Sequence, residues 1–184
     1  MNDEMSGVYD YSQDKLSGDK GEDVVIKFLE SHQNLKFVRK SSILHGDNPS
    51  DFDLLFLTPH GEEVTFEVKT DLYCKPKNDT GNMAIEHRRK EFGQQENIVD
   101  TGIRKTKAKF YIYYYWNLNE LWMIPTYELF GIIRNMKESG ILEAPGGKRH
   151  KWMGDQKRSL SYLIPRLKYK SKFFVFPIKR EDLK

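Results

Sequence analysis

Hydrophobic and polar positions alternate over residues 51–69, and this stretch predicts two adjacent β-strands joined by a tight turn. The first strand is expected at residues 51–57, which are rich in Leu and Phe. The second is expected at residues 62–69, where Val, Phe and Val occupy one face and Glu, Thr, Glu and Lys the other. Pro and Gly lie between the two strands and favour a turn.

Similar patterns along the rest of the chain predict a mixed α/β domain with a central sheet. The expected elements are, in chain order, a helix at 17–31, strands at 35–39, 51–57, 62–69 and 83–86, a functional loop at 93–106, strands at 110–116 and 121–124, a helix at 126–138 and a strand at 173–177. We expect one domain over residues 1–184, with residues 1–13 flexible and residues 148–184 forming a basic C-terminal extension packed on the core.

The net charge of +3 does not by itself indicate a nucleic-acid-binding protein, but the local distribution of charge changes the picture. Between residues 148 and 172 there are nine Lys and Arg against a single acidic residue, Asp155. Such a segment suits a polyanionic partner, and it equally suits a solvated basic surface. The charge pattern leaves both interpretations open.

Cysteine content and hydropathy indicate a cytoplasmic protein. Cys74 is the single cysteine, which excludes an internal disulfide and a cysteine-based zinc site. The N-terminus lacks the features of a secretory signal, and no apolar run is long enough to span a membrane. We expect no membrane partner and no small organic cofactor.

The candidate chemistry lies in the predicted hairpin, where Glu67 and Lys69 stand two residues apart within an apolar setting. Asp53, on the neighbouring strand, can reach the same edge. Two carboxylates and an ammonium group suit a hard divalent cation and a phosphate. Glu22, which follows Gly21 in the first turn of the first helix, either favours the helix dipole or points toward the same edge.

These residues resemble the motifs of the PD-(D/E)XK nuclease superfamily, and most of all its Holliday-junction-resolvase-like branch. The matching parts are Gly21-Glu22 on a helix, Asp53 on a strand and Glu67-Val68-Lys69 on the next strand. The resemblance covers residues 18–70 well and residues 81–125 in outline. The segments GNMAIE and TGIRKTKAKFYIYY are similar to a phage-type pattern in this superfamily. The resemblance implies a restriction-endonuclease-like α/β core, with a mixed sheet flanked by helices.

The resemblance also implies metal-dependent hydrolysis of DNA phosphodiester bonds by an endonuclease, with branched DNA as one candidate substrate. Asp53, Glu67 and the backbone carbonyl of Val68 would hold Mg²⁺, or Mn²⁺ in its place, and Glu22 would complete the ion shell. Lys69 would position or activate the attacking water or stabilise the developing charge. Branched-DNA resolvases act as dimers, which implies a homodimer. A non-catalytic DNA-binding module that keeps the nuclease fold is the alternative.

Several further residues stay open at this stage. Ser50, rather than the Pro of the family pattern, precedes Asp51, and Asp53 is chosen as the motif acid because it lies inside the predicted strand. Asp51 lies on the same strand face and stays the alternative. Glu86 is a candidate for binding a second metal ion or orienting the substrate, or is an exposed acid at a strand end. The candidate DNA contacts are Arg88, Arg89, Arg104, Lys105, Thr106 and Lys107.

Overall fold

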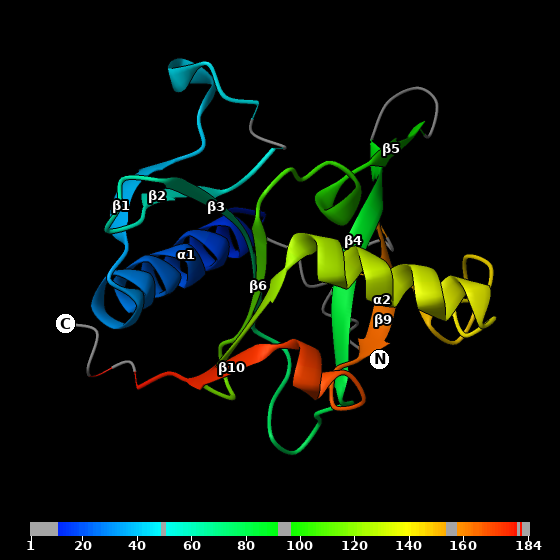
Figure 1. Cartoon of the computed structure of the whole chain (residues 1–184). Coiled ribbons are helices and arrows are strands. Elements are labelled where there is room, and N and C mark those ends of the chain that lie inside the picture. Colours follow the sequence, from blue (N-terminus) through cyan, green and yellow to red (C-terminus); the bar gives the residue numbers. More distant parts are fainter. Residues whose placement is uncertain (1–10, 49–50, 92–96, 154–157, 180, 182–184) are drawn as a thin grey trace, which may run out of the picture.

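The protein is built around a six-stranded mixed β-sheet (Figure 1), seen in a computed structural model that describes residues 11–48, 51–91, 97–153, 158–179 and 181. The strand order is β1-β2-β3-β6-β7-β10. The β3–β6 pair is parallel and the other pairs are antiparallel. The strands are β1 (Lys36–Lys40), β2 (Leu54–Leu57), β3 (Glu63–Asp71), β6 (Phe110–Tyr115), β7 (Glu120–Pro125) and β10 (Phe174–Pro177). The predicted α/β class with a central mixed sheet is confirmed.

Helix α1 (Tyr11–Gln33) covers one face of this sheet and begins at Tyr11 rather than near residue 17. Its buried side chains Val25, Phe28 and Leu29 pack in one core with residues of β2, β3 and β6. The α1-facing partners include Leu54, Phe66 and Ile112. The alternation seen in the sequence of β3 therefore places its Val and Phe side chains under α1. The predicted flexible segment 1–13 falls mostly outside the described residues.

The opposite face of the central sheet packs against helix α2 (Thr126–Glu138) and a second sheet that the sequence did not predict. This second sheet has the order β5-β4-β9-β8 and is antiparallel throughout. Its strands are β4 (Asn82–Glu91), β5 (Asn97–Asp100), β8 (His150–Met153) and β9 (Ser159–Pro165). Tyr111 and Trp122 of the central sheet share a core with Met83, Ile85 and Tyr162 of the second sheet. Figure 1 shows the second sheet on the side of the molecule away from α1 and β1–β3.

Two sequence expectations need correction here. The segment 93–106 is not a loop throughout, because it contains β5 and a 3-10 turn at Gly102–Arg104. The strand expected at 83–86 is the ten-residue β4, which pairs with β9 along most of its length. The length of β4 is set by its pairing with the distant β9, and β5 pairs in turn with the end of β4, contacts that local periodicity does not report.

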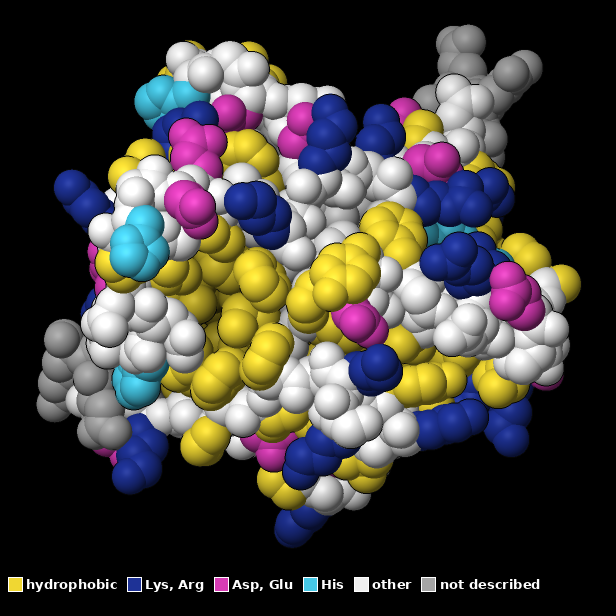
Figure 2. Space-filling view, in the orientation of Figure 1, with side chains coloured by type: hydrophobic (Ala, Val, Ile, Leu, Met, Phe, Trp, Pro, Cys, Tyr) yellow, Lys and Arg dark blue, Asp and Glu magenta, His cyan; other side chains and the backbone are white. Residues whose placement is uncertain are grey.

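The C-terminal third contributes strands to both sheets, since β9 pairs with β4 and β10 pairs with β7. Within the described residues, neither helix is long and apolar enough to cross a membrane. On the face drawn in Figure 2, Lys and Arg side chains lie among Asp and Glu side chains rather than in one continuous patch. The charge of this face alone therefore does not mark a nucleic-acid surface.

Candidate active site

Asp53 lies immediately before β2, not inside the strand as the sequence suggested, and its backbone and side chain both bond to neighbouring strands. Its N–H donates to the Phe66 carbonyl at 2.9 Å, and its own carbonyl accepts from the Ser41 N–H at 2.8 Å. Its carboxylate Oδ2 accepts the Val68 N–H at 2.7 Å. The Asp53 carboxylate thus accepts a β3 backbone N–H that a neighbouring strand would otherwise bind, at the part of β3 that does not pair with β2.

Glu67 and Lys69 project from β3 toward the second sheet. In the parallel β3–β6 register, Glu67 is paired with Tyr111 and Lys69 with Tyr113, and both tyrosines belong to the core on the side of the second sheet. Neighbouring positions of paired strands face the same way, so Glu67 and Lys69 share this direction. The alternation that buries Val68 under α1 therefore presents the two charged residues on the other face.

A cavity of about 620 Å³ gathers the residues that the sequence singled out. We call it the carboxylate cavity; its lining includes Glu22, Asp53, Glu67, Lys69 and Glu86. These side chains come from α1, the approach to β2, β3 and β4, which lie far apart in the sequence. The fold thus brings together all four proposed catalytic residues and Glu86.

The two central carboxylates have a strongly perturbed environment. Burial raises the pKa of Glu67, and the neighbouring charge of Asp53 raises it further. Burial also raises the pKa of Asp53, against the lowering effect of the Val68 N–H. Two half-buried carboxylates that oppose each other's ionisation form a site that a divalent cation would stabilise.

The donor set fits a hard cation that keeps much of its water. Asp53 and Glu67 supply carboxylate oxygens. The Val68 carbonyl points to the same edge of β3 as the Val68 N–H that Asp53 binds, because both groups of one strand residue face the same neighbour. Among the described residues there is no cluster of three or more His, Cys, Asp or Glu side chains suited to a metal ion. Asp53, Glu67 and the Val68 carbonyl are the groups that could hold a hard cation which also binds water and substrate phosphate.

Glu22 reaches the cavity because α1 approaches β3 closely at Gly21. A Cβ added to Gly21 would lie 1.9 Å from the Thr70 hydroxyl oxygen, so this approach requires glycine. The Glu22 carboxylate is ion-paired with Lys40 of β1 at 2.9 Å. Burial raises the pKa of Glu22 and the Lys40 ammonium opposes that rise. This pairing favours contact of Glu22 with a bound ion through water over direct ligation.

Lys40 is a residue of the site that sequence reasoning missed. Its ammonium lies 2.9 Å from Glu22 and 3.1 Å from Asp23, so it bridges two acids at the middle of α1, not in the first turn that the sequence predicted. The alternation of β1 gives no hint of this role, because Lys36 and Lys40 look alike in sequence. Only the placement of α1 beside β1 distinguishes them.

Glu86 lines the carboxylate cavity with both of its oxygens already hydrogen-bonded. The Thr101 hydroxyl donates to Oε1 at 2.8 Å, and the Ser159 hydroxyl donates to Oε2 at 2.6 Å. Gly102, whose added Cβ would lie 2.5 Å from the Glu86 carbonyl oxygen, lets the following turn pack on β4. Glu86 is thus a fixed wall of the cavity and not an exposed strand-end acid.

Asp51, the alternative motif acid, does not line the carboxylate cavity. Its carboxylate is ion-paired with Lys107 at 2.8 Å, and its carbonyl accepts hydrogen bonds from the Lys107 N–H and the Thr106 hydroxyl. Asp51 therefore anchors the segment that leads into β6. The placement favours Asp53 over Asp51 as the motif acid.

The six basic or hydroxyl residues proposed as DNA contacts divide into two groups. Arg89 and Lys105 line the carboxylate cavity. Arg88 and Arg104 are both ion-paired with Asp100, at 3.2 Å and 2.9 Å. Thr106 is buried beside Glu67, whose pKa its hydroxyl lowers, and Lys107 pairs with Asp51. Among the five basic residues, Arg89 and Lys105 are placed where a phosphate at the carboxylates would meet them.

Comparison with known proteins gives limited information. No family model matches the chain, and no curated protein matches it. Among solved structures, the bacterial homing endonuclease I-Ssp6803I matches over 64% of this chain and 72% of its own, with 20% identity and a TM-score of 0.46. Similarity at this level does not establish a shared function.

Proposed function

We propose that the protein is a metal-dependent DNA endonuclease of the PD-(D/E)XK type, with Asp53, Glu67 and Lys69 as its catalytic residues. The observation that carries this proposal is the carboxylate cavity itself, in which two carboxylates with raised pKa face each other beside a lysine. Perturbed carboxylates in a cleft are typical of sites that bind a catalytic metal. A pair of surface salt bridges would leave neither carboxylate in this state.

Asp53 and Glu67, with the Val68 carbonyl, would hold Mg²⁺, which when bound supplies a polarised water and neutralises charge on the scissile phosphate. The Val68 N–H fixes the Asp53 carboxylate in place, so little reorganisation is needed when DNA binds. Lys69 would orient the attacking water or stabilise the negative charge that develops on the phosphate oxygens. Glu22, held by Lys40, would contact the ion through water.

Removal of the Lys69 ammonium tests the proposal directly. We expect Lys69→Ala to lower the rate of Mg²⁺-dependent cleavage by about 10²-fold or more, since a charge aimed at the reacting phosphate is lost. The measurement uses labelled single-stranded, duplex and four-way-junction DNA, with Mg²⁺ and with EDTA. Lys27→Ala, which removes an exposed lysine from α1, serves as the control and should cut like the parent. Equal rates for Lys69→Ala and the parent would contradict the assignment.

Arg89 and Lys105 are expected to contact DNA phosphates, because within the described part of the chain no carboxylate is ion-paired with either side chain and both line the cavity. The double variant Arg89→Ala/Lys105→Ala should lower the slope of log affinity against log salt by about two. Arg88→Ala/Arg104→Ala is the matched control, since these two charges already pair with Asp100. Binding is measured by fluorescence anisotropy with Ca²⁺ at several salt concentrations. A larger change in slope for the control pair would overturn this division.

A non-catalytic DNA-binding module is the second candidate. It would use Arg89 and Lys105, which line the carboxylate cavity, to bind DNA phosphates without hydrolysis. The two functions differ in the cleavage assay above. DNA binding without Mg²⁺-dependent cutting of any of the three substrates would select the module over the nuclease.

The finer part of the proposal is that the substrate is branched DNA and that the protein acts as a homodimer, since resolution of a branch requires two sites that cut two strands. Size-exclusion chromatography with light scattering, with and without junction DNA, measures the number of copies. A single copy on the junction would remove the homodimer from the proposal while leaving hydrolysis itself in place.

A further inference from the structure

A second cavity, of about 880 Å³, adjoins the carboxylate cavity where the two sheets separate beyond the end of β3. We call it the loop cavity, because the loop between β3 and β4 forms one of its walls. The two cavities share Glu22, Val68, Lys69 and Glu86 as lining residues, so they lie side by side. A nucleotide bound at Asp53 and Glu67 therefore lies next to the loop cavity. Its volume lies in the range of about 300–1,000 Å³ that is usual for small-ligand sites.

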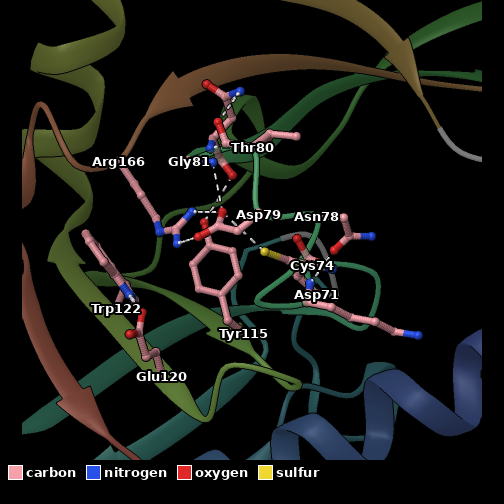
Figure 3. Close-up of polar contacts among 12 residues, drawn as sticks. Asp71, Cys74, Asn78, Asp79, Thr80, Gly81, Tyr115, Glu120, Trp122 and Arg166 are labelled. Carbon is pink, nitrogen blue, oxygen red and sulfur yellow. Dashed lines mark hydrogen bonds and ion pairs between the residues drawn. The ribbon is translucent and has the colours of Figure 1, made fainter.

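The wall made by the loop is fixed in place before any ligand binds. Arg166 is buried, and its guanidinium forms a two-pronged contact with Asp79 in the loop (Figure 3), with one of the two bonds at 2.7 Å. The same guanidinium stacks over Tyr115, 4.6 Å from the ring centroid. At the start of the loop, the Asp71 carboxylate accepts the N–H groups of Tyr73 and Cys74 at 2.8 and 2.9 Å. These contacts make the loop cavity a preformed site.

The chemistry of the lining disfavours a phosphate and suits a flat, uncharged group. Three of the lining side chains are acidic, Glu22, Asp71 and Glu86, against Lys69 as the single basic one. Much of the remaining lining is apolar, and includes Leu72, Ala84 and Met153. An anion in this cavity would meet mostly like charge. Phosphates are better placed at the carboxylate cavity, where Arg89 and Lys105 lie.

Tyr73 provides a stacking surface at the loop cavity. Its side chain lines the cavity and is 70% exposed, while its backbone N–H is held by Asp71. Aromatic side chains that stand exposed on a fixed backbone are the usual platforms for unpaired bases, since every base presents a π-face. A base within a duplex is already stacked on both sides and cannot reach such a platform without leaving the helix.

We propose that the loop cavity binds the base of an unpaired nucleotide, stacked on Tyr73, next to the phosphate held at the carboxylate cavity. This inference rests on the proposed nuclease function and specifies its substrate as DNA with an unpaired nucleotide near the cleaved bond. The base either is unpaired beforehand, as at a bulge or branch, or is flipped out of a duplex on binding. In both cases the base would lie beside the phosphate, because the two cavities share lining residues.

The test measures binding of two DNA probes to Tyr73→Ala. One probe is a fluorescein-labelled matched duplex and the other is the same duplex with one unpaired nucleotide at its centre, both titrated in Ca²⁺ by fluorescence anisotropy. Loss of base stacking should weaken binding of the bulged probe by about tenfold. Tyr127→Ala is the matched control, since Tyr127 is 72% exposed on α2 and does not line the loop cavity. Both substitutions are at exposed side chains, and thermal melts of the two variants measure whether each is folded.

The outcomes separate the two sources and the two proposals. Weaker binding of the bulged probe alone supports a base that is unpaired beforehand, and weaker binding of both probes supports flipping. Unchanged binding of both probes by Tyr73→Ala, or an equal loss with Tyr127→Ala, overturns the inference. In that case Mg²⁺-dependent cleavage by the parent protein still decides the nuclease function separately. Failure of the parent to cut any DNA would instead remove the proposed function.

Discussion

Glu67→Gln should abolish Mg²⁺-dependent DNA cleavage and at the same time stabilise the metal-free protein. The variant loses a carboxylate that would bind the metal, so the cleavage rate should fall by about 10³-fold or more. The amide keeps the shape of the side chain and removes the negative charge of Glu67, which burial and the nearby Asp53 carboxylate both disfavour. The parent therefore carries an electrostatic cost in its metal-free state that the variant does not.

The sign of the stability effect follows from the raised pKa of Glu67. When the pKa of a carboxyl is higher in the folded state than in the unfolded state, the free energy of unfolding falls as the pH rises above the unfolded-state pKa. Below that pKa the carboxyl is protonated in both states and does not change the free energy of unfolding. The variant should thus melt about 3–9 °C higher than the parent at pH 8 in EDTA, from about 1–3 kcal/mol of unfolding free energy. The difference should vanish near pH 4, where the carboxyl is protonated in both states.

Calorimetry in EDTA at several pH values, beside cleavage assays in Mg²⁺, measures both effects. Glu63→Gln is the matched control, because Glu63 lies on the same strand and is exposed at the far end from the cavity. The control should match the parent in both assays. A Glu67→Gln protein that is less stable than the parent at pH 8 would show that the carboxylate is stabilised by the fold, against the proposed role.

Asp79→Asn should cost about 3 kcal/mol of unfolding free energy, the second large effect that the structure predicts. The substitution leaves the Arg166 guanidinium, 4% exposed, without its charged partner. Breaking one half of a buried ion pair is far more costly than losing the pair as a whole, because the remaining charge stays desolvated. The melting temperature should fall by about 6–12 °C.

The pH dependence gives this prediction a second readout. The Arg166 guanidinium lowers the pKa of Asp79 well below its usual range, so the pair stabilises the protein at neutral pH and loses its effect as the pH falls through the acid range. The gap between the parent and Asp79→Asn should therefore narrow below about pH 4. Glu128→Gln, which breaks the exposed Lys172–Glu128 pair, is the control and should change stability by less than about 1 kcal/mol. An Asp79→Asn effect no larger than that of the control would contradict the assigned importance of the buried pair.

Local patterning was sufficient to predict the second strand of the central hairpin and helix α2 from their periods, and the strand β6 from its aromatic content. The same alternation predicted that Glu67 and Lys69 share a face of β3, and the β3–β6 register places both on the side of the second sheet. Burial under α1 explains why Val64, Phe66 and Val68 occupy the other face. These features depend on neighbours in sequence and were therefore accessible from sequence.

Other features of the site depend on segments that are distant in sequence, and the sequence could not supply them. The second sheet exists because β4 pairs with β9, more than seventy positions later, and each strand alone is short or weakly patterned. Asp53 lines the carboxylate cavity and Asp51 does not, and the Val68 N–H binds the Asp53 carboxylate at the open edge of β3. Lys40 meets Glu22 only because Gly21 lets α1 lie close to β3. The sequence by itself thus determined which residue types are available for metal and phosphate chemistry. Tertiary packing decided which of them face the carboxylate cavity, because that depends on contacts between distant segments that no local pattern records.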